Sequence, residues 1–221
     1  MRGIKLIMKE RMNITTNGLL ITLEGIDGSG KSTLAHALHD ALKARNISVI
    51  LTREPGGSDL GKHLRAMLQD RHIPLCPKAE FLLFAADRAQ HIHDVIIPQL
   101  QEHKIIISDR MADSSLVYQG YGRGLDLNFI DMVNAWTMDG IKPNLTFYLK
   151  ISPEQARKRL EKRSKQLTAF EQEIDSFRNR LVKGFEAIFE KRNTVVTLDA
   201  MLSIDELTEK AVAAIIPLLK K

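Results

Sequence analysis

Residues 25–32 have the types and the spacing expected of a site that binds phosphate groups. They read Gly-Ile-Asp-Gly-Ser-Gly-Lys-Ser and fit the phosphate-binding pattern G-x-x-x-x-G-K-[S/T]. Glycines let backbone N–H groups approach phosphate oxygens, and the start of a following helix adds its positive dipole end. Lys31 is expected to reach the β- and γ-phosphates of a nucleotide, and the Ser32 hydroxyl to coordinate Mg²⁺. The predicted nucleotide-binding residues are Gly25, Ile26, Asp27, Gly28, Ser29, Gly30, Lys31, Ser32 and Thr33.

Asp109 and Arg110 form a second polar signal, directly after the isoleucine-rich stretch 105–108. If that stretch is a buried strand, Asp109 lies where a carboxylate would organise Mg²⁺ directly or through water. The alternative is an ordinary capping acid. Arg110 can bind phosphate through two parallel hydrogen bonds, and its alternative is a surface ion pair.

Three further groups carry weaker signals. Phe84 and Arg88 are four residues apart, so they share one helix face and suit a heterocyclic base with carbonyl edges. Spacing alone better fits a core phenylalanine and a solvated arginine. Residues 118–120, Tyr-Gln-Gly, offer an amide for a base edge or form a plain loop. The basic residues within 157–165 form either a lid over phosphates or a solvated helix face.

The elements that position these groups are predicted from the apolar pattern. Short apolar runs near 19–24, 47–52, 105–108, 145–149 and 195–198 alternate with segments of helical spacing. This alternation predicts one α/β domain with three layers, in which helices cover both faces of a five-stranded parallel sheet of the P-loop NTPase type. Ligands bind such sheets beyond the carboxyl ends of the strands, which brings the polar signals together.

Two local predictions concern helices. The helix expected near 78–102 is predicted to bend near Pro98, because proline lacks the N–H that continues a helix. Trp136 is predicted to lie in the core. The histidine pairs at 36 and 39 and at 91 and 93 are predicted to lie on helix surfaces, since no Cys/His metal pattern includes them.

Composition restricts the class of protein. The 221 residues are 44% hydrophobic, but no apolar run approaches the ~18 residues that span a membrane, so no membrane association is expected. The single cysteine, Cys76, excludes an internal disulfide, which favours the cytoplasm. The net charge of +5 is scattered, which favours phosphorylated small molecules over nucleic acid. Residues 1–18 are expected to form a basic, disordered extension, and residues 19–221 the folded domain.

Five stretches, taken in order, resemble bacterial thymidylate kinases, a family of P-loop nucleoside monophosphate kinases. They are residues 23–33, 52–57, 82–88, 109–110 and 113–120. The resemblance extends from about residue 19 to the C-terminus. It implies transfer of the γ-phosphoryl group of ATP, bound with Mg²⁺, to dTMP, giving dTDP. It also implies a homodimer whose substrates are small molecules.

The resemblance assigns roles around the dTMP base and sugar. Phe84 would stack on thymine, and Arg88 would hydrogen-bond its carbonyl edge. Ser115 and Gln119 would also face the base. Tyr118 would pack against the sugar, where it could sense the missing 2′-hydroxyl.

At the phosphate end, the resemblance places Arg53, Arg65 and Arg110 near the dTMP phosphate. Glu54 would order the loop that contains Arg53, and Asp27 would accept a hydrogen bond from the deoxyribose 3′-hydroxyl. Within the ATP site, Lys31 and Arg110 would be catalytic, with Ser32 and Asp109 at the metal.

The family supplies a further catalytic arginine from the phosphate loop or from a lid, expected here near 160–170. Gly28 occupies the loop position, so the resemblance implies that the lid supplies the cation. Arg163 is the candidate. Lys162 and Lys165 stay as alternatives, because the Asp-Arg pair usual in bacterial members is absent near 167–168.

Other functions remain open at this point. No Asn-Lys-x-Asp motif is present, which argues against a GTPase. The acceptor could be another nucleoside monophosphate or a deoxynucleoside. Outside the kinases, the chain could be a P-loop ATPase acting on nucleic acid, or a nucleotide-binding subunit without turnover.

Overall fold

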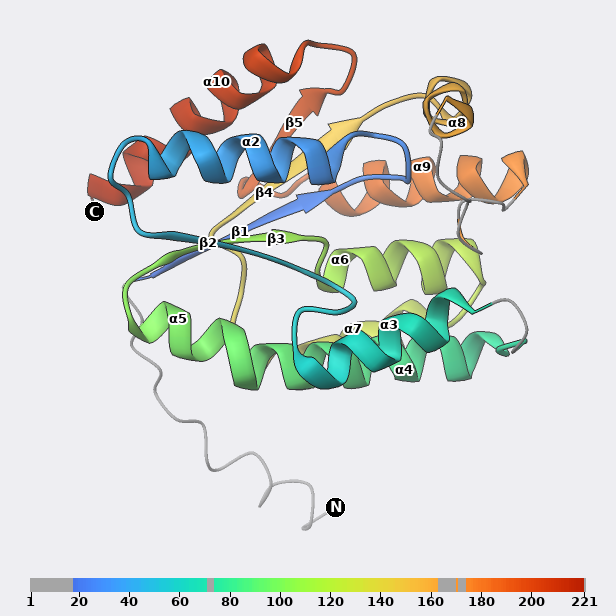
Figure 1. Ribbon diagram of the computed structural model, residues 1–221. Coiled ribbons are helices and arrows are strands. Elements are labelled where there is room, and N and C mark those ends of the chain that lie inside the picture. The colour runs from blue at the N-terminus through green and yellow to red at the C-terminus, as the bar shows by residue number, and fades with distance from the viewer. Residues whose placement is uncertain (1–17, 71–73, 163–169, 171–173, 221) are drawn as a thin grey trace.

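The computed structural model describes residues 18–70, 74–162, 170 and 174–220. Five parallel strands form one sheet in the order β2-β3-β1-β4-β5 (Figure 1). The strands are β1 (Leu19–Glu24), β2 (Val49–Arg53), β3 (Ile105–Asp109), β4 (Leu145–Lys150) and β5 (Val195–Asp199). The predicted five-stranded parallel sheet is therefore confirmed. The expected N-terminal extension lies outside the described residues, except for its last glycine.

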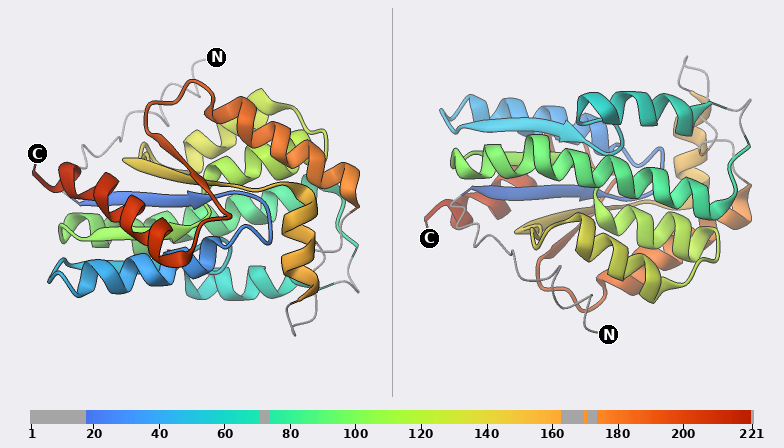
Figure 2. Two further views of the ribbon diagram at one scale, coloured as in Figure 1. Left: turned by 90° about the horizontal axis from the view of Figure 1, so that it is seen from above. Right: turned by 90° about the horizontal axis from the view of Figure 1, so that it is seen from below.

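Helices cover both faces of the sheet, as the two views of Figure 2 also show. In Figure 1, α2 and α10 lie on one side of the sheet, and α3, α4, α5 and α7 lie on the other. The described helices are α2 (Lys31–Lys43), α3 (Asp59–Gln69), α4 (Pro77–His91), α5 (Ile97–Gln101), α6 (Ala112–Ser115), α7 (Leu127–Thr137), α8 (Pro153–Glu161), α9 (Asp175–Phe189) and α10 (Ile204–Ile215), with π-helical turns at Ile92–Ile96 and Leu116–Gly122 and a 3₁₀ turn at Ile216–Lys220.

Two apolar cores hold the layers together. Successive strand side chains point to opposite faces, so Ile21 and Leu23 join a large core with α2, α9 and α10. Leu20 joins a smaller core with Ile96 and Leu100 on the other face. The central strand β1 is buried on both sides, which is why it begins with three consecutive apolar residues rather than an alternating pattern.

Local sequence explains where several helices begin. The Ser58 side chain accepts a hydrogen bond from Gly61 N–H and caps α3. Ser203 and Glu206 form a reciprocal capping box at the start of α10. The helix predicted to bend near Pro98 is divided by a π-helical turn at Ile92–Ile96, and Pro98 lies in the first turn of α5.

Two predictions about burial are wrong. Trp136 is 75% exposed rather than in the core, because it shares a face of α7 with the exposed Phe129 and Met132, whereas Ile130 forms part of the buried face. His91 is completely buried rather than on a helix surface. The His91 side chain contacts polar groups of the protein instead of water. The spacing of apolar residues along a helix does not predict such contacts.

Within the described ranges, no helix is long and apolar enough to cross a bilayer.

Candidate active site

The glycine loop joins the end of β1 to the start of α2, as the sequence predicted. Gly28 has a φ of 85°, in the left-handed region, and a Cβ there would lie 2.5 Å from the carbonyl oxygen of Ala156 in α8. Both conditions select glycine. An arginine at this position would therefore be incompatible with the observed placement of α8.

Lys31 lies above the loop as the first residue of α2 and is only 6% exposed. Its Nζ donates to the carbonyl oxygen of Ile26 at 2.9 Å, which holds the ammonium group over the loop. Burial and the positive charge of Arg110 lower the pKa of Lys31 to about 8. The ammonium group remains mostly protonated at neutral pH and forms no ion pair with a carboxylate of the described residues, so it suits an anionic ligand.

Ser32 and Asp109 offer oxygen ligands beside Lys31. The Ser32 hydroxyl donates to Asp109 Oδ2. Asp109 Oδ1 is buried and has no hydrogen-bond partner among the described residues. Mg²⁺ prefers such oxygen ligands and is held by one or two carboxylates together with phosphates. The donor set therefore fits Mg²⁺, with the orphaned Oδ1 available to bind the ion or its water.

Arg110 connects the loop to the neighbouring cavity. Its φ of 75° is unusual for a residue other than glycine, and it lies at the turn after β3. The guanidinium group donates to Asp27 Oδ1 at 2.7 Å, to Tyr118 Oη at 2.9 Å and to the carbonyl oxygen of Gly25 at 3.0 Å. Burial would raise the pKa of Asp27, but Arg110 and Lys31 outweigh burial and lower it to about 2. The Asp27 carboxylate is thus ionised and fixed in position.

Arg88 is 1% exposed and is held by three side chains. Its Nε donates to Glu54 Oε2 at 3.0 Å, Nη1 to Asn134 Oδ1 at 2.7 Å, and Nη2 to Ser115 Oγ at 2.9 Å. A guanidinium group has five N–H donors, so these contacts within the described chain leave two for a ligand.

A cavity of about 130 Å³ lies beside Arg88. It brings together most of the residues predicted to contact dTMP, with Phe170 on its rim. Phe84 packs 5.9 Å from Phe170 between ring centroids, and Tyr118 packs 6.1 Å from it. The predicted dTMP-binding residues that line this cavity are Asp27, Glu54, Arg65, Phe84, Arg88, Arg110, Ser115, Tyr118 and Gln119.

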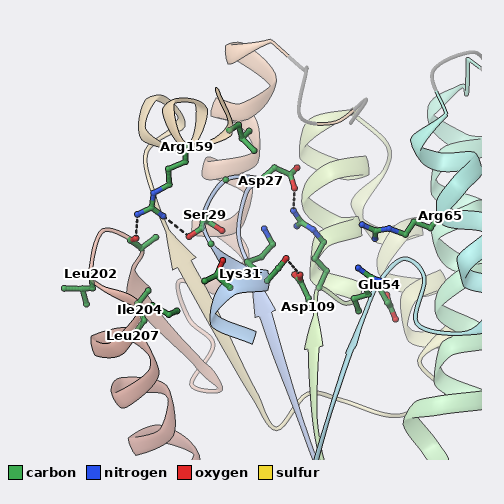
Figure 3. Close-up of a pocket in the computed structure, with 18 residues that line it drawn as sticks. Asp27, Ser29, Lys31, Glu54, Arg65, Asp109, Arg159, Leu202, Ile204 and Leu207 are labelled. Atoms are coloured by element: carbon green, nitrogen blue, oxygen red, sulfur yellow. Dashed lines mark hydrogen bonds and ion pairs between the residues drawn. The ribbon is translucent and has the colours of Figure 1, made fainter. Parts of the chain in front are cut away.

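A larger cleft of about 500 Å³ lies over the phosphate loop (Figure 3). It shares Asp27, Glu54, Arg65 and Arg110 with the smaller cavity, so the two spaces adjoin at these side chains. Arg53 lines the larger cleft and not the smaller cavity. The predicted nucleotide-binding and metal residues lining this cleft are Asp27, Gly28, Ser29, Gly30, Lys31, Ser32, Thr33 and Asp109; Gly25 and Ile26 contribute the carbonyl oxygens described above.

Arg65 is one of the two arginines at the boundary of the two spaces. Burial, with the charges of Arg53 and Arg110 nearby, lowers the pKa of Arg65. The Arg65 Nη1 atom donates to the carbonyl oxygen of Pro55 at 2.8 Å, which holds its guanidinium group toward the junction. Arg65 and Arg110 lie at the junction and Arg53 borders the larger cleft, so an anion bound among them would reduce their mutual repulsion.

Sequence reasoning missed several residues of the site. Arg159 donates to the carbonyl oxygens of Ser29 at 3.3 Å and Ala200 at 2.7 Å and lines the larger cleft. It lay within the predicted basic lid, but spacing did not distinguish it. Leu202 and Ile204 form an apolar end of the cleft. Their position after the last strand was an available signal, because ligands bind at strand carboxyl ends.

The lid candidate Arg163 lies outside the described residues, as does Lys165. Lys162 is the C-cap residue directly after α8, and it does not line either space. The lid cation therefore stays a prediction.

Asp87 is a buried carboxyl group on α4 next to this site. Gly56 N–H donates to its Oδ1 at 2.9 Å, whereas Oδ2 has no partner in the described part of the chain. Burial and the charge of Glu54 raise the pKa of Asp87 to about 6 from its ordinary 3.8. A carboxyl group with a raised pKa destabilises the fold when it is ionised.

We expect this group to lower the free energy of unfolding as pH rises from about 4 to about 6. In that window the unfolded chain releases the Asp87 proton while the folded chain keeps it. Asp87→Asn removes this contribution, so it should gain on the order of 2 kcal/mol over the wild type between pH 4 and pH 7. Urea unfolding of both proteins across this range checks the result. Parallel pH profiles would contradict it.

The fold and the site together define a P-loop kinase. A lysine-bearing phosphate loop follows the central strand of a parallel sheet, and a second, smaller cavity adjoins it. The thymidylate kinase family model matches residues 23–211. The chain belongs to the thymidylate kinase family.

Individual relatives agree with this assignment. The thymidylate kinase of Halothermothrix orenii is 45% identical over 192 residues, which cover 86% of this chain and 92% of that protein. The thymidylate kinase of an Exiguobacterium species is 39% identical over 191 residues, covering 86% and 90% respectively. The crystal structure of thymidylate kinase from Ehrlichia chaffeensis matches with a TM-score of 0.73 at 32% identity, over 90% of this chain and 98% of that one. The predicted family, fold class and activity, a nucleoside monophosphate kinase that phosphorylates dTMP to dTDP, are confirmed.

Proposed function

We propose that the γ-phosphoryl group of ATP passes to dTMP at the junction of the two spaces described above. The observation that carries this proposal is their shared boundary, formed by Asp27, Glu54, Arg65 and Arg110. Donor and acceptor phosphates bound in adjoining spaces would meet among cations. Such positioning converts a bimolecular reaction into an effectively unimolecular one.

The reaction needs no side-chain general base. A phosphate monoester has a second pKa near ~6, so dTMP is largely dianionic at neutral pH. One of its oxygens attacks the γ-phosphorus, the bond to the β–γ bridging oxygen breaks, and ADP leaves with that electron pair. The protein contributes alignment and neutralisation of charge.

On the donor side, the backbone N–H groups of the glycine loop hold the phosphates, and Lys31 neutralises the β- and γ-phosphates. Ser32 and Asp109 would hold Mg²⁺, which when bound supplies further positive charge to the phosphate oxygens. Arg159 borders the same cleft. A lid cation completes the donor site, with Arg163 as the candidate and Lys162 and Lys165 as alternatives.

On the acceptor side, Phe84 stacks on thymine, and the two remaining N–H donors of Arg88 reach its carbonyl edge. Gln119 and Ser115 face the base. Tyr118 packs against the sugar.

The dTMP phosphate is held among the three arginines. Arg53, Arg65 and Arg110 neutralise its charge, while Glu54 orders their loop. Asp27 accepts a hydrogen bond from the 3′-hydroxyl, because its ionised carboxylate faces the boundary of both spaces.

A substrate panel tests the proposal. ADP release is measured with dTMP, dUMP, dCMP and thymidine in parallel, with and without Mg²⁺, and with DNA in place of an acceptor. We expect turnover with dTMP and Mg²⁺ to exceed all the others. Stimulation by DNA, or binding of dTMP without formation of dTDP, would reject the proposal.

We further propose that the protein is a cytoplasmic homodimer that pairs through α7. Phe129, Met132 and Trp136 project from one exposed face of this helix, and Leu82 of the adjacent α4 is also exposed. Large exposed apolar groups of this kind mark interaction surfaces. The single cysteine supports a reducing compartment.

Trp136→Glu is expected to convert the dimer into a monomer of 25.0 kDa, because the substitution buries an unpaired charge at the centre of the contact. Light scattering after size-exclusion chromatography measures the mass. Leu219→Glu is the control, since Leu219 is 41% exposed near the C-terminus, away from α7. A wild-type monomer, or a dimeric Trp136→Glu protein, would refute this interface.

A further inference from the structure

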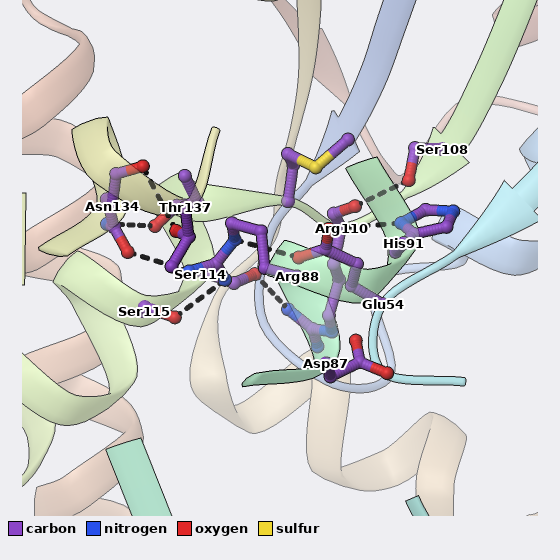
Figure 4. Close-up of polar contacts among 12 residues, drawn as sticks. Glu54, Asp87, Arg88, His91, Ser108, Arg110, Ser114, Ser115, Asn134 and Thr137 are labelled. Atoms are coloured by element: carbon purple, nitrogen blue, oxygen red, sulfur yellow. Dashed lines mark hydrogen bonds and ion pairs between the residues drawn. The ribbon is translucent and has the colours of Figure 1, made fainter. Parts of the chain in front are cut away.

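His91 is a buried polar residue that the mechanism above does not use. It is the last residue of α4 and is completely inaccessible to solvent. Its Nε2 lies 2.7 Å from Thr52 Oγ1 on β2. Its Nδ1 lies 3.1 Å from Glu54 Oε1 (Figure 4). The imidazole ring thus joins the end of a strand to the loop that follows it.

Helix geometry places His91 beside the base-binding residues. Phe84, Asp87, Arg88 and His91 follow the spacing i, i+3, i+4, i+7 and therefore share one face of α4. The loop after β2 packs closely on this face. A Cβ at Gly57 would lie 2.4 Å from the His91 ring, so only a glycine there lets the ring reach Glu54.

The contacts form a short chain that ends at Arg88. Glu54 Oε2 accepts from Arg88 Nε at 3.0 Å, while Oε1 faces His91. A carboxylate oxygen only accepts hydrogen bonds, so Nδ1 of His91 must be the donor. Nε2 makes the second contact, with the Thr52 hydroxyl, so the ring is fixed at both ends.

We propose that His91 is a positioning residue for nucleobase recognition. By occupying Glu54 Oε1 it fixes the carboxylate so that Oε2 restrains Arg88, whose two remaining N–H donors then face the cavity. The inference rests on the proposed role of Arg88 at the thymine carbonyl edge. His91 would thus touch no substrate, yet it would set the affinity of the enzyme for dTMP.

Loss of His91 would leave a buried carboxylate oxygen without its partner. Glu54 is only 4% exposed, so water cannot readily replace the ring. The carboxylate would turn toward other donors, and Arg88 would have to be reordered each time dTMP binds. Reordering of this kind lowers affinity without altering the reacting groups.

Two substitutions separate the ring nitrogens. The amide nitrogen of asparagine occupies nearly the position of Nδ1, whereas that of glutamine occupies nearly the position of Nε2. We expect His91→Gln to raise the KM for dTMP by about tenfold to a hundredfold, the range for one lost hydrogen bond to a charged group. The KM for ATP and kcat should change little. His91→Asn should restore most of the dTMP affinity, and His93→Gln, at an exposed position two residues on, should match the wild type.

A double-mutant cycle tests whether His91 acts through Glu54. In a Glu54→Gln background, His91→Gln should add little to the KM for dTMP, because the contact is already altered. Additive effects, an equal rise in the KM for ATP, or equal behaviour of His91→Asn and His91→Gln would overturn the proposal. Failure of the proposed function is distinct, because it would appear as absent dTMP turnover in the wild-type enzyme.

Discussion

Lys31→Ala is expected to lower kcat by about a thousandfold or more, while the protein still folds. Lys31 is the buried cation of the phosphate loop, and its Nζ is already held at the Ile26 carbonyl oxygen before a ligand binds. Such a preplaced charge acts where negative charge develops and needs no reorganisation during the reaction. Because burial lowers its pKa, its removal should not destabilise the free protein.

Steady-state kinetics and thermal unfolding together check this expectation. The melting temperature should stay the same or rise, since a desolvated charge has been removed. Lys31→Met keeps the aliphatic stem and serves as the matched control for packing; its kcat should be as low as that of Lys31→Ala. Turnover close to that of the wild type in either variant would exclude Lys31 from catalysis.

Arg110→Ala is the second large effect, and it should combine a catalytic loss with a loss of stability. Arg110 lies at the junction of both spaces, so we expect kcat to fall by about a thousandfold. It also holds Asp27, whose pKa is low because of this contact. The ion pair is largely buried, so we expect a stability loss of roughly 2 kcal/mol at neutral pH.

Two variants separate these effects. Arg110→Lys keeps the charge but loses the planar fork, so its kcat should lie between those of the wild type and Arg110→Ala. Adding Asp27→Asn to Arg110→Ala removes the unpaired carboxylate and should recover stability without recovering kcat. Recovery of kcat in that double variant would instead show that Arg110 only neutralises Asp27.

The arrangement of the sheet could be predicted because it follows from local patterns. Continuous apolar runs identify strands buried on both faces, and parallel strands bring their carboxyl ends to one edge. The sequence therefore predicted that the phosphate loop, Arg53 and Arg110 lie at the same edge of the sheet. The placement of Phe84 and Arg88 in the adjoining cavity could be expected only from the family resemblance, since spacing alone favoured a plain core helix.

The buried polar contacts could not be predicted in this way. Glu54, Asn134 and the α4 pair Arg88 and His91 come from three separate stretches, and none of these residue types is usually buried. Their burial depends on mutual hydrogen bonding, which no periodicity records. The prediction for Trp136 is wrong for the opposite reason. The apolar type of a side chain does not indicate whether its neighbours belong to the same chain or to another.

Trp136 is the sole tryptophan of the chain, and it stands at the outer surface of α7. Intrinsic fluorescence excited at the indole therefore reports on that surface rather than on the interior. If two copies meet there, simple dilution should shift the emission toward longer wavelengths as the rings become hydrated. Unfolding of a monomer should barely change the emission wavelength. This fluorescence signal would therefore report association rather than denaturation.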